Sequence, residues 1–193
     1  RAFAVAPAGL KPKLFDLIDR EIEFAKAGKP ARIVAKLNSL SNQSMIDKLY
    51  EASQAGVSIH LIVRGVCCLR PGVPGLSENV RVISIVDRFL EHSRILAVSG
   101  GGEEEVYISS ADWMTRNLSR RVELLCPVYD PSIRQMLLNL LQMNLLDNVK
   151  ARELEPSGNY SRVAGTEQPL RSQFGAADIP LWKTVAIASM EQL

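Results

Sequence analysis

Apart from His92, every basic side chain in the middle of this sequence is an arginine. No lysine occurs between residues 64 and 121, and the basic side chains there are Arg64, Arg70, Arg81, Arg88, Arg94, Arg116, Arg120 and Arg121. A guanidinium group pairs with phosphate oxygens through two parallel hydrogen bonds and keeps its charge, so the pattern favours recognition of an oxyanion. Ordinary surface ion pairs are the alternative. Acidic partners are present in the same window, namely Glu78, Asp87, Glu91, Glu103, Glu104, Glu105 and Asp112.

The chain has two histidines, and only one is well placed for chemistry. His92 lies in FLEHSRI, between an apolar pair and a predicted strand. An imidazole can exchange a proton near neutral pH or attack phosphorus, although a structural role is the alternative. His60 lies inside a predicted strand, out of phase with Ile59 and Leu61, and we expect it at a solvated or core-edge position.

Several common catalytic signatures are missing. The chain lacks the G-x-x-x-x-G-K-[ST] loop, and three glutamates follow the Gly100–Gly102 run, which excludes a P-loop kinase. It also lacks the usual zinc-hydrolase motifs and G-x-S-x-G. The phospholipase D motif H-x-K-x-x-x-x-D is incomplete, because Arg94 stands in place of its lysine and Ser99 in place of its aspartate. A phosphodiesterase is therefore disfavoured.

Composition describes one globular domain, or two very small ones. The chain has 193 residues, 47% of them hydrophobic, and a net charge of +2, so bulk charge names no partner. Three cysteines without C-x-x-C spacing fit a reducing cytosol. No apolar run approaches the length of a membrane helix, and the start at Arg1 suggests a fragment of something longer.

Periodicity predicts an α/β layered fold. Its first half reads as helix, strand, helix, strand over Lys13–Lys26, Ala31–Leu37, Gln43–Ala55 and Val57–Val63. Ser41 or Asn42 is the expected cap of the second helix. The strand–helix–strand unit requires parallel strands and a right-handed crossover.

A long loop, Gly65–Asn79, follows the last of these strands at the end where open α/β sheets place ligands. The elements expected after it are strands at Val80–Val86, Ile95–Val98, Val106–Ser109 and Val122–Val128, a hairpin turn at Gly100–Gly102, and a helix from Pro131 to about Val149. After Leu154 the pattern predicts no regular element up to the last residues. There, IPLWKTVAIASMEQL could form a docking helix.

Long strings in the chain resemble the C-terminal half of bacterial-type polyphosphate kinases. They are RIVAKLNSL, EASQAGVSIHLIVRGVCCLRPGVPGLSENVRVISIVDRFLEHSRI, EVYISSADWMTRNLSRRVELL and DNVKARE. The likeness runs from about Leu10 to about Val163, and SGGGEEE and the C-terminus depart from it. It implies a phospholipase D-like layered sheet with flanking helices. Residues 1–163 would form the second such domain of the catalytic half, and residues 164–193 an uncertain extension.

The same resemblance implies an enzyme that reversibly transfers the ATP γ-phosphate to inorganic polyphosphate through a phosphohistidine. The arginine of VRG, the histidine of EHSR and the second arginine of RRVE carry over to Arg64, His92 and Arg121 as ATP phosphate ligands. His92 would also be catalytic, acting on the leaving or entering oxygen. Magnesium would arrive with ATP, and no protein metal ligand is assigned.

The phosphorylated histidine of the family lies in a preceding domain, and neither His60 nor His92 matches its context. We therefore expect half a site that is inactive alone, with ATP, ADP, polyphosphate and the enzyme's own N-terminal domains as partners. A homo-oligomer, no nucleic acid and a cytoplasmic location are also expected, with peripheral membrane association left open. The alternatives are a non-catalytic polyanion-binding or oligomerisation module and, less favoured, a phospholipase D-like phosphodiesterase.

Overall fold

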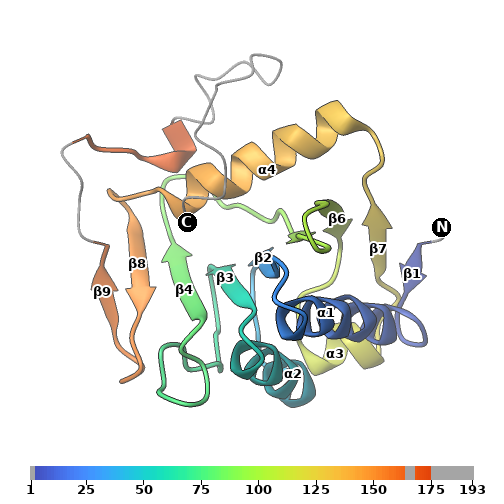
Figure 1. Cartoon of the computed structure of the whole chain (residues 1–193). Coiled ribbons are helices and arrows are strands. Elements are labelled where there is room, and N and C mark those ends of the chain that lie inside the picture. The colour runs from blue at the N-terminus through green and yellow to red at the C-terminus, as the bar shows by residue number, and fades with distance from the viewer. Residues whose placement is uncertain (1–2, 164–167, 175–193) are drawn as a thin grey trace.

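The computed structural model describes residues 3–163 and 168–174 and centres on one nine-stranded sheet (Figure 1). The strand order is β1-β7-β6-β5-β2-β3-β4-β8-β9. The strands are β1 (Ala4–Val5), β2 (Arg32–Leu37), β3 (Ser58–Val63), β4 (Val80–Ile85), β5 (Ile95–Val98), β6 (Glu105–Ser109), β7 (Leu124–Pro127), β8 (Ala151–Leu154) and β9 (Tyr160–Arg162). The helices are α1 (Leu10–Lys26), α2 (Gln43–Gln54), α3 (Thr115–Ser119) and α4 (Pro131–Leu145). None of these helices is long and apolar enough to cross a membrane.

The directions of the strands bring several strand ends to one edge. Strands β2, β3 and β4 are parallel, whereas β5 pairs antiparallel with β2 and β8 pairs antiparallel with β4. The C-terminal ends of the three parallel strands therefore lie beside the N-terminal ends of β5 and β8. We call this edge, which carries Asn38, Arg64, Arg94 and Asp112, the site edge.

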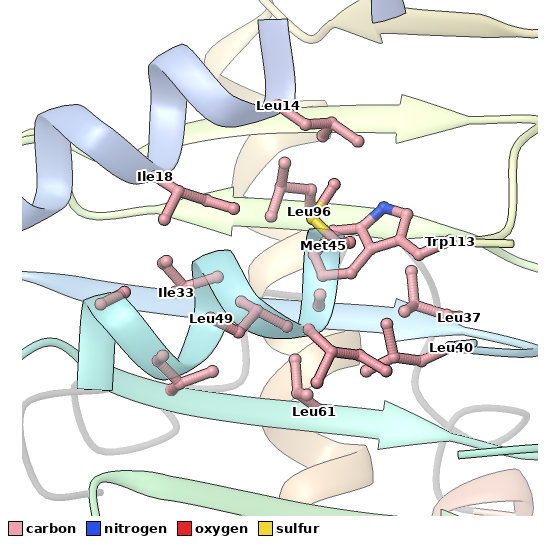
Figure 2. Close-up of a cluster of buried hydrophobic side chains, with 14 of the residues drawn as sticks. Leu14, Ile18, Ile33, Leu37, Leu40, Met45, Leu49, Leu61, Leu96 and Trp113 are labelled. Carbon is pink, nitrogen blue, oxygen red and sulfur yellow. The ribbon is translucent and has the colours of Figure 1, made fainter. Parts of the chain in front are cut away.

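Helices pack on both faces of the sheet. On one face, α1 and α2 bury Leu14, Met45 and Leu49 against alternate strand residues (Figure 2). On the other face, α4 contributes Leu138 and Leu141 to a second cluster with the intervening strand residues. Strands covered on both faces lose the apolar–polar alternation, which is why β2 and β3 are almost wholly buried.

The local predictions of the first half are confirmed. The strand–helix–strand unit has parallel β2 and β3, and Asn42 caps α2 by accepting a hydrogen bond from the Met45 N–H at 3.1 Å. The Gly100–Gly102 hairpin joins antiparallel β5 and β6, and all three glycines have positive φ. A side chain at Gly101 would also meet the Phe24 ring at 2.7 Å. Glycine is thus required there on two grounds.

Other expectations differ from the structure. The last long helix ends at Leu145 rather than near Val149, because Asp147 accepts the N–H groups of Val149, Lys150 and Ala151 and turns the chain into β8. Short β1, α3, β8 and β9 were not predicted from the sequence. The proposed docking helix in IPLWKTVAIASMEQL lies outside the described residues.

His60 is buried, not solvated, with 8% of its surface exposed. Its Nε2 lies 3.1 Å from the Ser58 hydroxyl, and its Nδ1 has no partner among the described residues. Burial, followed by the positive charges of Arg81 and Arg32, lowers the pKa of His60 from 6.5 to about 4. The folded protein therefore holds this imidazole neutral.

This depressed pKa predicts an acid-sensitive contribution to stability. The unfolded chain binds a proton at His60 below about pH 6.5 while the folded chain does so only near pH 4, so folding weakens as pH falls through that window. By about pH 5 the loss from this group should reach about 2 kcal/mol. In His60→Gln the free energy of urea unfolding should fall by that much less between about pH 7.5 and pH 5. Equal losses in both proteins would contradict the assignment.

Candidate functional site

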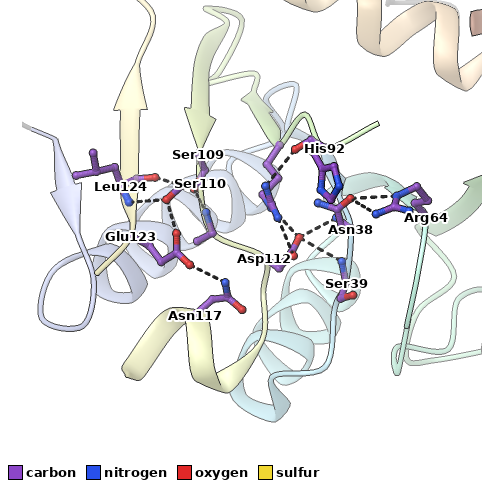
Figure 3. A network of polar contacts seen from close by, with 12 residues as sticks. Asn38, Ser39, Arg64, His92, Ser109, Ser110, Asp112, Asn117, Glu123 and Leu124 are labelled. Atoms are coloured by element: carbon purple, nitrogen blue, oxygen red, sulfur yellow. Dashed lines mark hydrogen bonds and ion pairs between the residues drawn. The ribbon is translucent and has the colours of Figure 1, made fainter. Parts of the chain in front are cut away.

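A buried carboxylate, Asp112, organises the site edge. Its Oδ1 accepts the backbone N–H of Asn38 at 2.8 Å and of Ser39 at 3.3 Å, just beyond the end of β2. Arg94 donates to both carboxylate oxygens, from Nε at 3.0 Å and from Nη2 at 3.1 Å (Figure 3). Burial alone would raise the pKa of Asp112, but the hydrogen bonds from Arg94 and Asn38 outweigh burial and hold that pKa below its usual value.

Arg64 lies at the end of β3, and its guanidinium is fixed in direction by Asn38. Both Nε and Nη2 donate to the Asn38 side-chain oxygen, at 3.1 and 2.8 Å. Gly65 permits the close approach behind this pair, since its N–H donates to the Asn38 carbonyl at 2.7 Å and a Cβ there would lie 2.8 Å from that oxygen. The buried Asn38 Nδ2 has no partner among the described residues. Arg64 Nη1 likewise has no hydrogen-bond partner in the part of the chain that the structure describes.

His92 lies beside this pair in the loop that precedes β5. Figure 3 draws His92, Asn38 and Arg64 at the same end of the polar network around Asp112. The imidazole is exposed, whereas the backbone of the loop is held because Arg94 Nη1 donates to the His92 carbonyl at 3.1 Å. The structure thus links the Arg64 guanidinium, through Asn38, and the His92 backbone, through Arg94, to the same Asp112 network at the site edge.

A second set of contacts holds the same loop from its other side. Gln173 accepts the Phe89 N–H and donates to the Phe89 carbonyl, each at 2.8 Å, and donates to Glu91 at 2.8 Å. The other oxygen of Glu91 accepts from the buried Lys36 ammonium at 2.7 Å, and Lys36 also donates to Asn144 of α4 at 2.6 Å. The His92 loop is therefore tied to β2 and to α4.

The segment that carries Gln173 is itself anchored. Arg171 forms a two-pronged ion pair with Asp87, with N–O distances of 2.7 and 2.5 Å. The fully buried Ser172 donates to Asp147 from its N–H and its hydroxyl, each at 2.8 Å. Residues 168–174 thus form part of the support of the site.

Arg121 is not joined to Arg64 and His92 by any contact within the described residues. It is exposed in the turn between α3 and β7. That turn is fixed by Glu123, which accepts from Asn117 at 2.7 Å and from the Ser110 hydroxyl. Figure 3 places this group on the far side of Asp112 from Arg64. Of the predicted phosphate ligands, Arg64 and the His92 backbone are therefore linked to the Asp112 network, whereas no contact between described residues links the Arg121 side chain to it.

The two positions that break the phospholipase D motif have structural roles. Arg94 uses all three of its guanidinium nitrogens, on Asp112 and on the His92 carbonyl. Ser99 lies at the opposite end of β5, where its hydroxyl donates to the buried Glu21 at 3.1 Å. Neither residue faces His92 as a free catalytic group.

The carboxylates near His92 are already engaged. Asp112 is bound by Arg94 and backbone N–H groups, and Glu91 is bound by Lys36 and Gln173. No group of three or more potential metal ligands occurs in the described part of the chain. The donor set visible at this edge therefore does not fit a metal held by side chains of this domain.

Sequence reasoning missed the residues that support the site. Asn38 and Ser39 were noticeable as polar residues after a buried strand, but Asp112, Lys36 and Gln173 were not singled out. Lys36 carried a usable signal, because a lysine inside an otherwise apolar strand must find a partner when buried.

The chain matches the family model described as polyphosphate kinase C-terminal domain 2 over residues 3–173. It is 51% identical to the polyphosphate kinase of Halalkalibacterium halodurans over 178 residues, which cover 91% of this chain and 25% of the relative. The polyphosphate kinase of Thermosynechococcus vestitus is 54% identical over 160 residues, covering 83% of this chain and 22% of the relative. This chain thus spans about a quarter of the length of these relatives. The predicted boundary at residue 163 stays a prediction.

Solved structures confirm the predicted fold. The crystal structure of polyphosphate kinase from Porphyromonas gingivalis superposes with a TM-score of 0.88 at 45% identity, covering 91% of this chain and 27% of that one. The phospholipase D family member Nuc from Salmonella typhimurium superposes with a TM-score of 0.56 at 11% identity, covering 84% of this chain and 97% of Nuc, which shows the fold alone. The chain has the phospholipase D-like fold and belongs to the polyphosphate kinase family.

Proposed function

We propose that this chain supplies one half of a phosphoryl-transfer site that moves the ATP γ-phosphate reversibly to inorganic polyphosphate. The observation that carries the proposal is that the fixed Arg64 guanidinium and the loop of the exposed His92 are tied to one network at the edge where strand ends converge. Phosphoryl transfer demands positioned charge more than covalent chemistry from the protein, so oriented donors suit it. The name of the matched family supports the substrate class.

Each residue has a distinct role in this proposal. Arg64, already held by Asn38 through two of its nitrogens, offers Nη1 to the oxygens of the transferred phosphoryl group. His92 stabilises or protonates the oxygen that leaves or enters across the phosphorus. Arg121, exposed in the turn between α3 and β7, binds the nucleotide phosphates.

The phosphorylated histidine belongs to a preceding domain. His60 is buried and has a depressed pKa, and its position inside β3 keeps it from an incoming phosphate. His92 is exposed, but it takes the assisting role at the shared site. The nucleotide partners, the polyphosphate acceptor and the assembly with the other domains are all part of this proposal.

Magnesium enters with the nucleotide. Because the carboxylates of Asp112 and Glu91 are engaged by Arg94, Lys36 and Gln173, neither is free to bind the ion. Magnesium prefers phosphate oxygens and retained water in such sites. Bound to ATP, the ion would supply charge screening of the triphosphate, and Arg64 and His92 would act on the remaining phosphate oxygens.

The first prediction concerns nucleotide binding. Arg64→Gln should weaken Mg-ATP binding to the chain by roughly 10- to 100-fold, because one charged hydrogen-bonding group is removed. His92→Asn should weaken it less, since an imidazole contributes a single hydrogen bond. Isothermal titration calorimetry measures both. Arg70→Gln is the matched control, because Arg70 is an exposed arginine in the loop after the same strand. The Arg70→Gln protein should bind Mg-ATP as tightly as the parent chain.

If Arg70→Gln lost as much affinity as Arg64→Gln, binding would reflect general charge and the assigned site would be wrong. The unfolding free energy of each variant, measured in urea, separates loss of binding from loss of fold.

A second prediction concerns covalent chemistry. Incubation of this chain with γ-labelled Mg-ATP should leave no acid-labile, alkali-stable label on the protein, because neither histidine occupies the place of the phosphorylated one. Mass spectrometry and label retention provide the measurement. Stable phosphohistidine on His60 or His92 would overturn the division of roles proposed here.

A third prediction concerns the support of the His92 loop. Gln173→Ala removes three hydrogen bonds and leaves the Phe89 N–H without its partner, so amide exchange at Phe89 should accelerate by at least about tenfold. Mg-ATP affinity should fall by several-fold while the rest of the sheet keeps its protection. Gln135→Ala, an exposed glutamine of α4, is the control. Unchanged exchange at Phe89 would show that Gln173 does not restrain the loop.

A further inference from the structure

A small basic cavity lies at the β8–β9 end of the sheet, away from Arg64 and His92. Its volume is about 140 Å³. Val86, Val149 and Ala151 form its apolar lining, and Lys150, Arg152 and Arg162 contribute the charged groups. None of the described residues that line it is a carboxylate. We call Lys150, Arg152 and Arg162 the β8–β9 cations.

The β8–β9 cations repel one another electrostatically unless an anion binds between them. Arg152 and Arg162 are directly opposite residues in the antiparallel pairing of β8 with β9. Side chains at such positions emerge on the same face with Cβ atoms roughly 5 Å apart, and like charges there repel. Within the described residues, neither guanidinium has a hydrogen bond or ion pair. Lys150 has no hydrogen bond from its ammonium there either, although its charge is attracted to Asp87 and helps to lower the pKa of that carboxyl.

The acidic residues nearby are committed elsewhere. Asp87 holds Arg171 through two hydrogen bonds, and the Arg171 contacts hold the pKa of Asp87 below its usual value. Asp147 accepts backbone N–H groups at the start of β8 and the hydroxyl of Ser172. Glu153, the neighbour of Arg152 along β8, pairs with Arg81 at 3.1 Å. No described carboxylate therefore pairs with Arg152 or Arg162, and their positive charge stays without a direct partner.

From this geometry we propose that the β8–β9 cations form a second oxyanion site, which binds a phosphate group of a polyphosphate chain. Two arginines and a lysine match the several oxygens and the charge of a phosphate better than they match a carboxylate. The cavity is smaller than the roughly 300 Å³ or more that drug-sized ligands occupy, and it has no aromatic side chain for a base. It suits a phosphate group and not a nucleoside.

The sheet connects this cavity to the Arg64 site. Arg152 is the register partner of Ser84 on β4, and the Ser84 hydroxyl donates to the Arg64 carbonyl at 3.3 Å. Strand β9 lies three positions from β3 in the sheet, roughly 14 Å at about 4.8 Å per strand. One phosphate group cannot reach both places. A ligand that touches both must carry phosphates along its length, which is a property of polyphosphate.

The proposal rests on the proposed function only for the choice of polyphosphate as the ligand. Binding of a phosphate at the β8–β9 cations requires neither ATP nor catalysis. The two ideas can therefore fail separately, and the test below has one arm for each.

The experiment compares the 193-residue chain with Arg152→Gln/Arg162→Gln by calorimetric titration at one fixed salt concentration. The probes are long-chain inorganic polyphosphate, Mg-ATP and single-stranded oligothymidylate. Affinity for polyphosphate should fall by at least about tenfold, which is about 1.4 kcal/mol. Mg-ATP affinity should change less than about twofold, and so should any weak affinity for oligothymidylate.

A matched control removes the same charge elsewhere. Lys26 and Lys29 are exposed at the end of α1, next to the start of β2 and thus at the edge opposite the site edge. Lys26→Gln/Lys29→Gln should retain polyphosphate affinity within about twofold. The fold has its own readout, because relief of the repulsion should leave the thermal midpoint of the Arg152/Arg162 variant, measured without phosphate, unchanged or higher.

Four outcomes would overturn the proposal: unchanged polyphosphate affinity in the arginine variant, an equal loss in the lysine control, an equal loss for oligothymidylate, or no polyphosphate binding by the parent chain. If the parent chain failed to bind Mg-ATP while polyphosphate binding depended on both arginines, the proposed ATP half-site would be wrong and the second oxyanion site would stand.

Discussion

The structure depends on the pairing of one buried carboxylate, Asp112, with the end of β2 and with Arg94. The pairing joins residues 74 and 18 positions apart in the chain. Removal of one partner from such a buried charge typically costs about 3–5 kcal/mol, because the other charge is left without compensation. Asp112 therefore does more than fill space. Asp112 accepts the backbone N–H of Asn38, and the Asn38 side chain in turn orients Arg64. Asp112 also binds Arg94, which donates a hydrogen bond to the His92 carbonyl.

The His92 loop illustrates how an exposed group can be positioned by buried ones. Its imidazole faces solvent, but hydrogen bonds hold the loop backbone on both sides. Arg94 donates to the His92 carbonyl, and Gln173 accepts the N–H of Phe89. Gln173 in turn contacts Glu91, which is paired with the buried Lys36. Such an arrangement lowers the entropic cost of binding, because the loop is already ordered before a phosphate arrives. Exposure and rigidity are therefore compatible at this position.

The sequence predicted those parts of the fold that depend on local pattern. Helical spacing located α1, α2 and most of α4, and β-branched runs located β2 and β3, because each element buries a continuous apolar surface. The pattern failed for β8 and β9, which are only four and three residues long and carry charged side chains. Their pairing depends on the neighbouring strand β4. Residue types made Arg64 and His92 candidates, and the family resemblance supplied their specific roles. The Asp112 and Gln173 contacts join residues too far apart in the chain for periodicity to predict.

Composition alone could not tell a structural arginine from one that meets a ligand, and contacts make that distinction. Three arginines form ion pairs with carboxylates and so stabilise the fold: Arg81 holds β8, Arg94 holds the site edge, and Arg171 holds the residues around Gln173. Arg121, Arg152 and Arg162 have no such partner in the described structure. A protein gains nothing in stability from leaving cations close together and unpaired, and for Arg152 and Arg162 the arrangement carries a cost. That cost is understandable if the ligand, and not the fold, supplies the missing negative charge.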